Sequence, residues 1–100
     1  MDKRFGQLVR KYRLENELTY KGLGELLNLS PGYLSDIENA NRYAPRGEVL
    51  EKIIDVLKLP KPEAYDFASA TRDELPEDVV KVIMENPKII QCIRNEYIEL

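Results

Sequence analysis

The sequence predicts an all-α fold of seven short helices. Apolar residues recur with the 3.6-residue period of amphipathic helices, and capping residues or prolines separate the successive stripes. No stretch shows the alternation of apolar and polar residues that is typical of a half-buried strand. The chain has 100 residues, of which 43% are hydrophobic and 33% charged, a composition expected of one soluble, helix-rich domain.

Local start and stop signals place the first three helices. The first covers residues 2–15, where apolar side chains form one stripe with basic residues between them. The second begins after Thr19, whose hydroxyl is a favoured N-cap, and ends near Asn28, a residue type that tolerates the left-handed conformation. The third begins after Ser30, an N-cap followed by proline at the first helical position, and runs to about residue 39.

Four more helices follow residues 40–46, whose asparagine and proline predict a loop. The apolar stripe between residues 49 and 57 predicts the fourth helix, and residues 62–71 predict a short fifth one. Pro76 and two acidic residues then signal the start of a sixth helix that ends near residue 86. Pro87 opens the seventh.

The second and third helices, joined by a tight turn, match the helix-turn-helix pattern. The run from Thr19 to Glu38, TYKGLGELLNLSPGYLSDIE, resembles the phage-repressor (lambda-repressor-like, Xre or Cro type) helix-turn-helix family. The similarity continues through PRGEVLEKIIDVLKL and covers roughly residues 2–70. It implies a lambda-repressor-like DNA-binding bundle of about five helices in residues 1–72, which leaves a helical C-terminal extension in residues 73–100.

The sequence departs from the family pattern at three positions. Tyr20 stands where the family usually has glutamine, and Asn28 and Ala40 stand where it often has glycine. Asn28 costs little, because asparagine is the next-best residue at positive φ. Tyr20 removes a side chain that orients the reading helix and touches phosphate in the family, although a tyrosine hydroxyl can also bind phosphate.

The resemblance implies that the third helix reads DNA. Pro31, Gly32 and Asp36 would face the base edges, where proline offers apolar contact, glycine close approach, and aspartate an acceptor for cytosine. Further expected readers are Tyr33, Ser35, Asn39, Asn41 and Arg42. Expected phosphate contacts are Lys21, Ser30, Pro31, Arg42, Tyr43 and Arg46. Simpler interpretations stay open, since Ser-Pro can begin any helix and arginines in a loop are often only solvated surface.

Two further charged residues match an ion pair of the family. Arg13 lies late in the first helix and Glu38 late in the third. We interpret this pair as mainly structural, because a partly buried pair orients two helices and loss of one member leaves the other uncompensated.

Several classes of function are excluded by composition. The chain has no histidine and a single cysteine, Cys92, so neither a zinc site nor a Cys/His nucleophile is possible. We therefore expect a protein that is not an enzyme and has no cofactor. Cys92 lies between Ile90 and Ile93 and is expected to be part of the core. No apolar run has the length of a membrane span or forms a secretory signal, so we expect a cytoplasmic protein without membrane contact.

Charge is distributed unevenly along the chain, whose net charge is −3. Residues 1–46 have eight basic and six acidic side chains, whereas residues 47–100 have seven and twelve. This asymmetry places any surface that binds a polyanion in the N-terminal half. Residues 76–100 carry more apolar side chains than a helix hairpin can bury, so they either fold back on the N-terminal domain or pair with a second copy.

Two hypotheses for function follow. The first is a sequence-specific double-stranded DNA-binding transcription regulator, a repressor that acts as a homodimer through residues 76–100 on a palindromic operator. The alternative is a protein-interaction module with the same fold, antitoxin-like or an inhibitor, which binds a protein partner and has weak or no DNA binding. Salt distinguishes them, because only DNA binding should weaken steeply as ionic strength rises.

Overall fold

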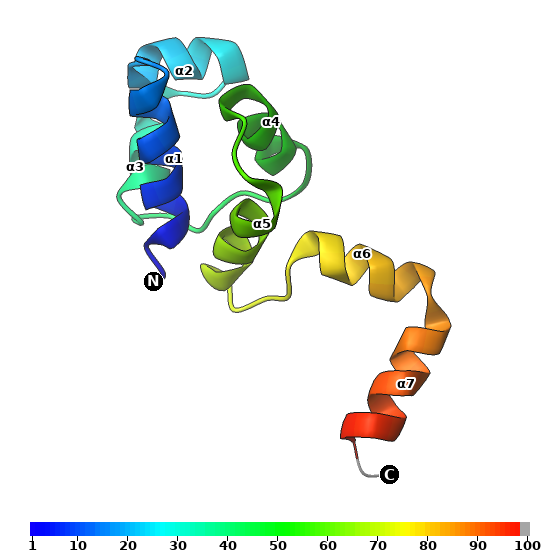
Figure 1. The fold of residues 1–100 in the computed structure, drawn as a ribbon. Coiled ribbons are helices and arrows are strands. Elements are labelled where there is room, and N and C mark those ends of the chain that lie inside the picture. Colours follow the sequence, from blue (N-terminus) through cyan, green and yellow to red (C-terminus); the bar gives the residue numbers. More distant parts are fainter. Residues whose placement is uncertain (99–100) are drawn as a thin grey trace.

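The computed structural model describes residues 1–98, which form seven α-helices and no strand (Figure 1). The helices are α1 (Arg4–Glu15), α2 (Tyr20–Leu27), α3 (Pro31–Glu38), α4 (Gly47–Leu57), α5 (Lys61–Ala70), α6 (Glu77–Glu85) and α7 (Pro87–Tyr97). The predicted all-α fold is therefore confirmed.

The core belongs to the first five helices. In Figure 1, α1 to α5 gather into a bundle in which α1 packs against α3, α4 and α5, and α2 packs against α3 and α4. Fifteen buried apolar side chains fill this bundle, among them Phe5, Leu23, Leu34, Leu50 and Ile53. The bundle of five helices with a two-helix extension, expected from the resemblance, is the observed architecture.

Capping interactions fix the ends of α2 and α3. The Thr19 hydroxyl accepts a hydrogen bond from the Gly22 N–H at 2.9 Å, and the Ser30 hydroxyl accepts one from the Tyr33 N–H at 3.1 Å. Between the helices, Asn28 has a left-handed conformation with φ of 57°. These contacts set the direction in which α3 leaves the turn.

Two residues show how closely the chain packs around α3. A Cβ atom on Gly24 would lie 2.4 Å from the Leu29 carbonyl oxygen, so α2 approaches the turn only because residue 24 is glycine. After α3, Ala40 has a φ of 56°, a conformation that favours glycine. Alanine at this departure from the family pattern is therefore strained.

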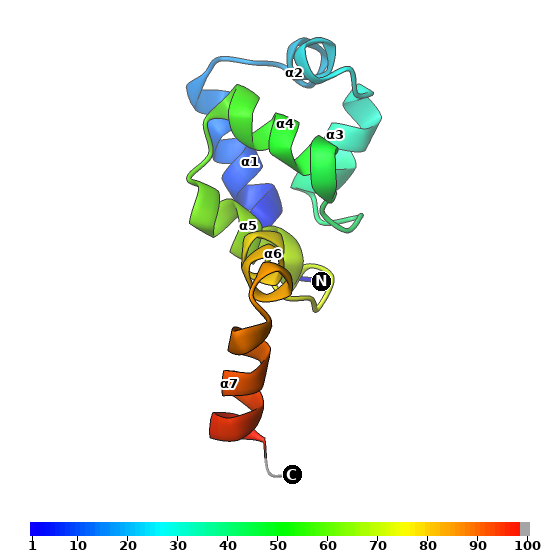
Figure 2. The same ribbon diagram turned by 90° about the vertical axis from the view of Figure 1, so that its right-hand side faces the viewer.

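The helices α6 and α7 extend away from the bundle (Figures 1 and 2). Helix α6 packs against α5, α7 packs against α6, and neither helix contains a buried residue. The described chain accordingly measures 52 Å along its longest axis but only 24 and 20 Å along the others. Residues 76–98 thus contact the edge of the bundle through α6 without becoming buried against it, and residues 99 and 100 of the expected extension lie outside the described residues.

The expectation for Cys92 was wrong, because its side chain is exposed on α7. The neighbouring isoleucines indicated an apolar face correctly, but no other helix of the described chain covers that face enough to bury it. Within residues 1–98, no helix is long and apolar enough to cross a membrane.

Candidate nucleic-acid interface

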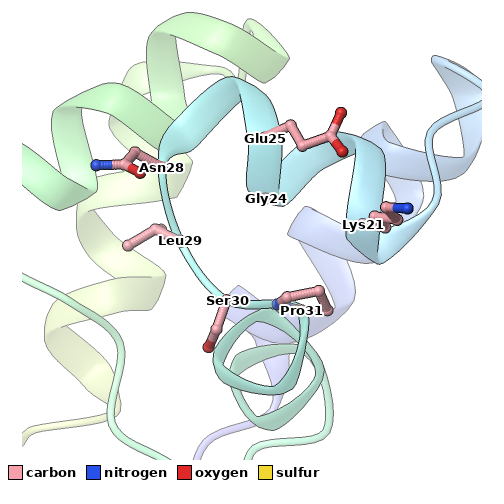
Figure 3. Close-up of a pocket in the computed structure, with 7 residues that line it drawn as sticks. All are labelled: Lys21, Gly24, Glu25, Asn28, Leu29, Ser30 and Pro31. Atoms are coloured by element: carbon pink, nitrogen blue, oxygen red, sulfur yellow. The ribbon is translucent and has the colours of Figure 1, made fainter.

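A surface groove lies between α2 and the start of α3, where a helix-turn-helix protein would meet phosphate (Figure 3). It has a volume of about 550 Å³ and is lined by Lys21, Gly24, Glu25, Asn28, Leu29, Ser30 and Pro31. Figure 3 shows Lys21 and Glu25 projecting from α2, with Ser30 and Pro31 at the N-terminus of α3. Backbone N–H groups and the dipole at a helix N-terminus attract anions, and Lys21 adds a positive charge, whereas Glu25 opposes it.

None of the expected DNA contacts is buried, so solvent reaches each of them. Pro31, Gly32, Asn39, Asn41 and Arg42 are exposed, while Tyr33, Ser35 and Asp36 are half-buried. Among the residues expected to contact phosphate, the following are also exposed: Lys21, Ser30, Tyr43 and Arg46. The opposite face of α3 buries Leu34, Ile37 and Glu38. Helix α3 is thus divided into a face that packs and a face that is open.

Some of these side chains are held by their neighbours. The Arg42 guanidinium lies over the Tyr33 ring, 4.9 Å from its centroid. The Asn39 side-chain amide donates to the Ser35 carbonyl at 2.9 Å and to the Ser35 hydroxyl at 3.3 Å. Tyr33 therefore restricts Arg42, and Ser35 restricts Asn39, before any ligand binds.

The expected ion pair between Arg13 and Glu38 is present and buried. Arg13 Nε donates to Glu38 Oε2 at 2.7 Å, and Arg13 Nη2 donates to Oε1 at 3.1 Å. Arg13 Nη1 also donates to the Leu18 carbonyl at 2.8 Å, which ties the end of α1 to the loop before α2. The hydrogen bond to Glu38 raises the pKa of Arg13 and so favours the charged form of the guanidinium.

Tyr20 completes this cluster, a role that the sequence analysis did not anticipate. Its hydroxyl donates to Glu38 Oε1 at 3.2 Å, and the Arg13 guanidinium lies 4.2 Å from the centre of its ring. Tyr20 therefore orients α2 relative to α1 and α3 from inside the protein. Its hydroxyl is bonded to Glu38 and not directed to a phosphate site in this structure.

The loop after α3 is held by the turn between α5 and α6. Thr71 Oγ1 accepts from the Ala44 N–H at 3.0 Å, while Arg72 Nη1 donates to the carbonyls of Ala44 and Pro45 at 2.7 and 2.9 Å. Glu77 accepts from the Gly47 N–H at 3.2 Å. These supporting residues lie 27 to 30 positions away in the chain, so no local sequence signal could have identified them.

A second groove, which shares no lining residue with the first, is acidic. It is formed by α4, α5 and α6 and is lined by Glu51, Tyr65, Glu77, Asp78, Lys81, Val82 and Glu85. Burial raises the pKa of Tyr65, and the nearby carboxylates of Glu51 and Asp78 raise it further. A polyanion is repelled from this groove.

Comparison with known proteins agrees with this geometry. A sequence model of the helix-turn-helix family matches residues 9–63, which include α2, the turn and α3. No curated protein shows significant similarity to the chain. The crystal structure of the clp gene regulator ClgR from Corynebacterium glutamicum is similar, with a TM-score of 0.57 at 18% identity over 98% of this chain and 95% of that one.

The family match covers more than half of the chain and coincides with two capped helices joined by a left-handed turn residue. The likeness to ClgR extends the shared fold across α6 and α7. The chain therefore belongs to the lambda-repressor-like (Xre-type) helix-turn-helix family of DNA-binding transcription regulators.

Proposed function

We propose that the protein is a sequence-specific regulator that binds double-stranded DNA as a homodimer and represses transcription from a palindromic operator. The observation that carries this proposal is the open face of α3, which begins beside Lys21 and is followed by Arg42. In this proposal residues 1–72 form the DNA-binding domain and residues 73–100 the dimerisation element. The N-terminus of α3 and Lys21 bind backbone phosphate and thereby place α3 in the major groove.

Sequence discrimination would depend on few side chains. Pro31 and Gly32 at the start of α3 donate no side-chain hydrogen bonds, so they allow close approach and apolar contact with a thymine methyl. Asp36 can accept from cytosine N4, at an electrostatic cost near phosphates. Arg42 is the strongest donor near this face, and its stacking on Tyr33 reduces the freedom that it would lose on binding. We propose that Arg42 contributes most to the affinity.

Dimerisation is supported by the exposed apolar side chains of the extension. Val79, Val80 and Met84 on α6 are 42%, 39% and 71% exposed, and Tyr97 on α7 is 83% exposed. An apolar surface of this kind on a small protein usually marks a contact site. A twofold dimer through α6 and α7 covers this surface and doubles the DNA contacts, which suits half-sites about one helical turn apart.

The alternative function is binding of a protein partner by the same fold. Glu25 in the groove and Asp36 on α3 favour it, because each places a negative charge where DNA would approach. A protein partner docking on the apolar faces of α6 and α7 would bind with little dependence on salt, whereas DNA binding depends on it strongly.

Fluorescence anisotropy tests the proposal. A labelled duplex from the region upstream of the gene is compared with a scrambled duplex at ~50 and ~200 mM salt. Tighter binding to the native duplex, weakened by salt and by Arg42→Ala, supports the regulator. Lys61→Ala is the matched control, because it removes the same charge on the acidic side of the bundle, next to Glu51 and Asp55.

Three outcomes decide between the functions. Arg42→Ala should reduce the magnitude of the slope of log K against log salt by about 1, as expected for the loss of one phosphate contact. Lys61→Ala should leave the slope unchanged. Equal weak binding to both duplexes contradicts regulation at that site. Light scattering that gives the 11.6 kDa monomer mass at tens of micromolar contradicts the homodimer.

A further inference from the structure

The arginine that ends the α3–α4 loop is already bound to a carboxylate. Arg46 forms an ion pair with Glu74 from the α5–α6 turn. The Arg46 side chain is 62% exposed, and it stands directly before α4 on the loop that follows the reading helix. A guanidinium that is expected from the sequence to contact DNA phosphate is thus occupied when DNA is absent.

The same carboxylate has a second partner that is buried. Glu74 accepts with Oε1 from Arg46 and with Oε2 from Arg72 Nε at 3.1 Å. The Arg72 side chain is only 5% exposed and is fixed by its bonds to the Ala44 and Pro45 carbonyls. Arg72 therefore holds Glu74 in place whether or not Arg46 is bound to it.

We infer that Glu74 competes with DNA phosphate for Arg46 and thereby lowers the affinity of the protein for DNA. This inference rests on the proposed function. Carboxylate and phosphate both offer paired oxygen acceptors to a guanidinium, so one replaces the other on Arg46 without a change in the type of bond. After the exchange Glu74 keeps its bond to Arg72, and its charge remains paired.

The energetic cost of this exchange is low. Arg46 and Glu74 are 62% and 39% exposed, and ion pairs between exposed groups contribute little to stability. The loop itself does not depend on Glu74, because Thr71 and Arg72 bind the backbone of Ala44 and Glu77 binds the N–H of Gly47. Removing the Glu74 charge should free Arg46 and leave the loop in position, because Arg72 keeps its bonds to the Ala44 and Pro45 carbonyls and its ion pair with Glu77 at 3.7 Å.

The chain offers a matched control one residue away. Asp73 lines the same small cavity as Tyr43, Arg46, Arg72 and Glu74, yet it forms no ion pair within the described residues. Its φ of 53° is a conformation that asparagine also tolerates. Asp73→Asn therefore removes the same charge from nearly the same place without releasing Arg46.

The test compares Glu74→Gln and Asp73→Asn with the natural chain on a labelled, mixed-sequence duplex of ~30 base pairs at ~50 and ~200 mM salt. Glu74→Gln should bind about two- to fivefold more tightly at the lower salt, the range expected from freeing an exposed ion pair. This gain should shrink at the higher salt, because screening weakens the competition. Asp73→Asn should increase the affinity for DNA by a clearly smaller factor. Thermal unfolding verifies that both variants are folded.

A double variant establishes that the effect passes through Arg46. In an Arg46→Met background, Glu74→Gln should change DNA affinity no more than Asp73→Asn does. An equal gain from both single variants, or a full gain that persists without Arg46, overturns the inference. If the natural chain binds DNA and Glu74→Gln gives no gain, the inference alone fails. If neither the natural chain nor any variant binds, the proposed function fails as well.

Discussion

Replacing Gly32 with alanine separates the stability of α3 from its role at the DNA. Gly32 is exposed at the second position of α3, and a Cβ atom there meets no other atom within 4 Å. Alanine loses less backbone entropy in a helix than glycine, by about 0.5 to 1 kcal/mol, so the free energy of unfolding should rise by up to that amount. Urea denaturation measures this change.

The same methyl group should weaken DNA binding. If the backbone at Gly32 approaches the base edges, the added group has to be accommodated at a close contact, at a cost of about 1 to 3 kcal/mol by analogy with an overpacked core. About 1.4 kcal/mol corresponds to a tenfold higher Kd, which anisotropy with the native duplex resolves easily. If the variant is more stable than the natural chain yet binds DNA less tightly, partial unfolding cannot be the cause of the weaker binding.

Gly24 provides the contrasting control. A Cβ atom on Gly24 would lie 2.4 Å from the Leu29 carbonyl oxygen, so Gly24→Ala should destabilise the fold by about 1 to 3 kcal/mol and weaken DNA binding together with the loss of stability. Unchanged DNA affinity in Gly32→Ala would refute the proposed orientation of α3, because it would mean that the start of the helix does not approach the DNA.

Three further predictions concern stability and assembly. Glu38→Gln should lower the free energy of unfolding by about 3 kcal/mol, measured by urea denaturation, because it leaves Arg13 buried without its carboxylate. Ala40→Gly should raise it by about 1 kcal/mol, since glycine relieves the left-handed strain, and no gain would show that residue 40 is unstrained. Met84→Glu should shift light scattering from dimer to monomer and leave monomer unfolding unchanged, whereas a persistent dimer places the interface elsewhere.

Features encoded by neighbouring residues could be predicted from the sequence. Ser30 followed by proline, and the Thr19 hydroxyl at the position before an apolar stripe, are local signals, and the helices begin where these signals place them. The Arg13–Glu38 pair could be predicted only from the family resemblance, because the two residues are 25 positions apart. Its burial followed from the packing of α1 against α3.

Features that depend on a distant partner could not be predicted. Arg46 and Glu74 are 28 positions apart, and Tyr20 and Glu38 are 18 apart, so neither contact leaves a periodic or local pattern in the sequence. The exposure of Cys92 illustrates the same limit. A helical stripe predicts which side of α7 is apolar, but whether another element covers that side is decided by tertiary structure.

The position of Tyr20 affects which residues of this chain would bind the DNA backbone. In the family pattern, the residue after the α2 cap both orients the reading helix and touches phosphate, whereas here the Tyr20 hydroxyl is bonded to Glu38 within the protein. Orientation of α3 is thereby provided from inside, together with Arg13, and does not require bound DNA. We propose that the phosphate contact at the start of α2 passes to Lys21, which is exposed one residue further along. The arginines of the loop after α3 would then contribute a larger share of the affinity for DNA. Competition by Glu74 for Arg46 would therefore lower that affinity by a larger factor.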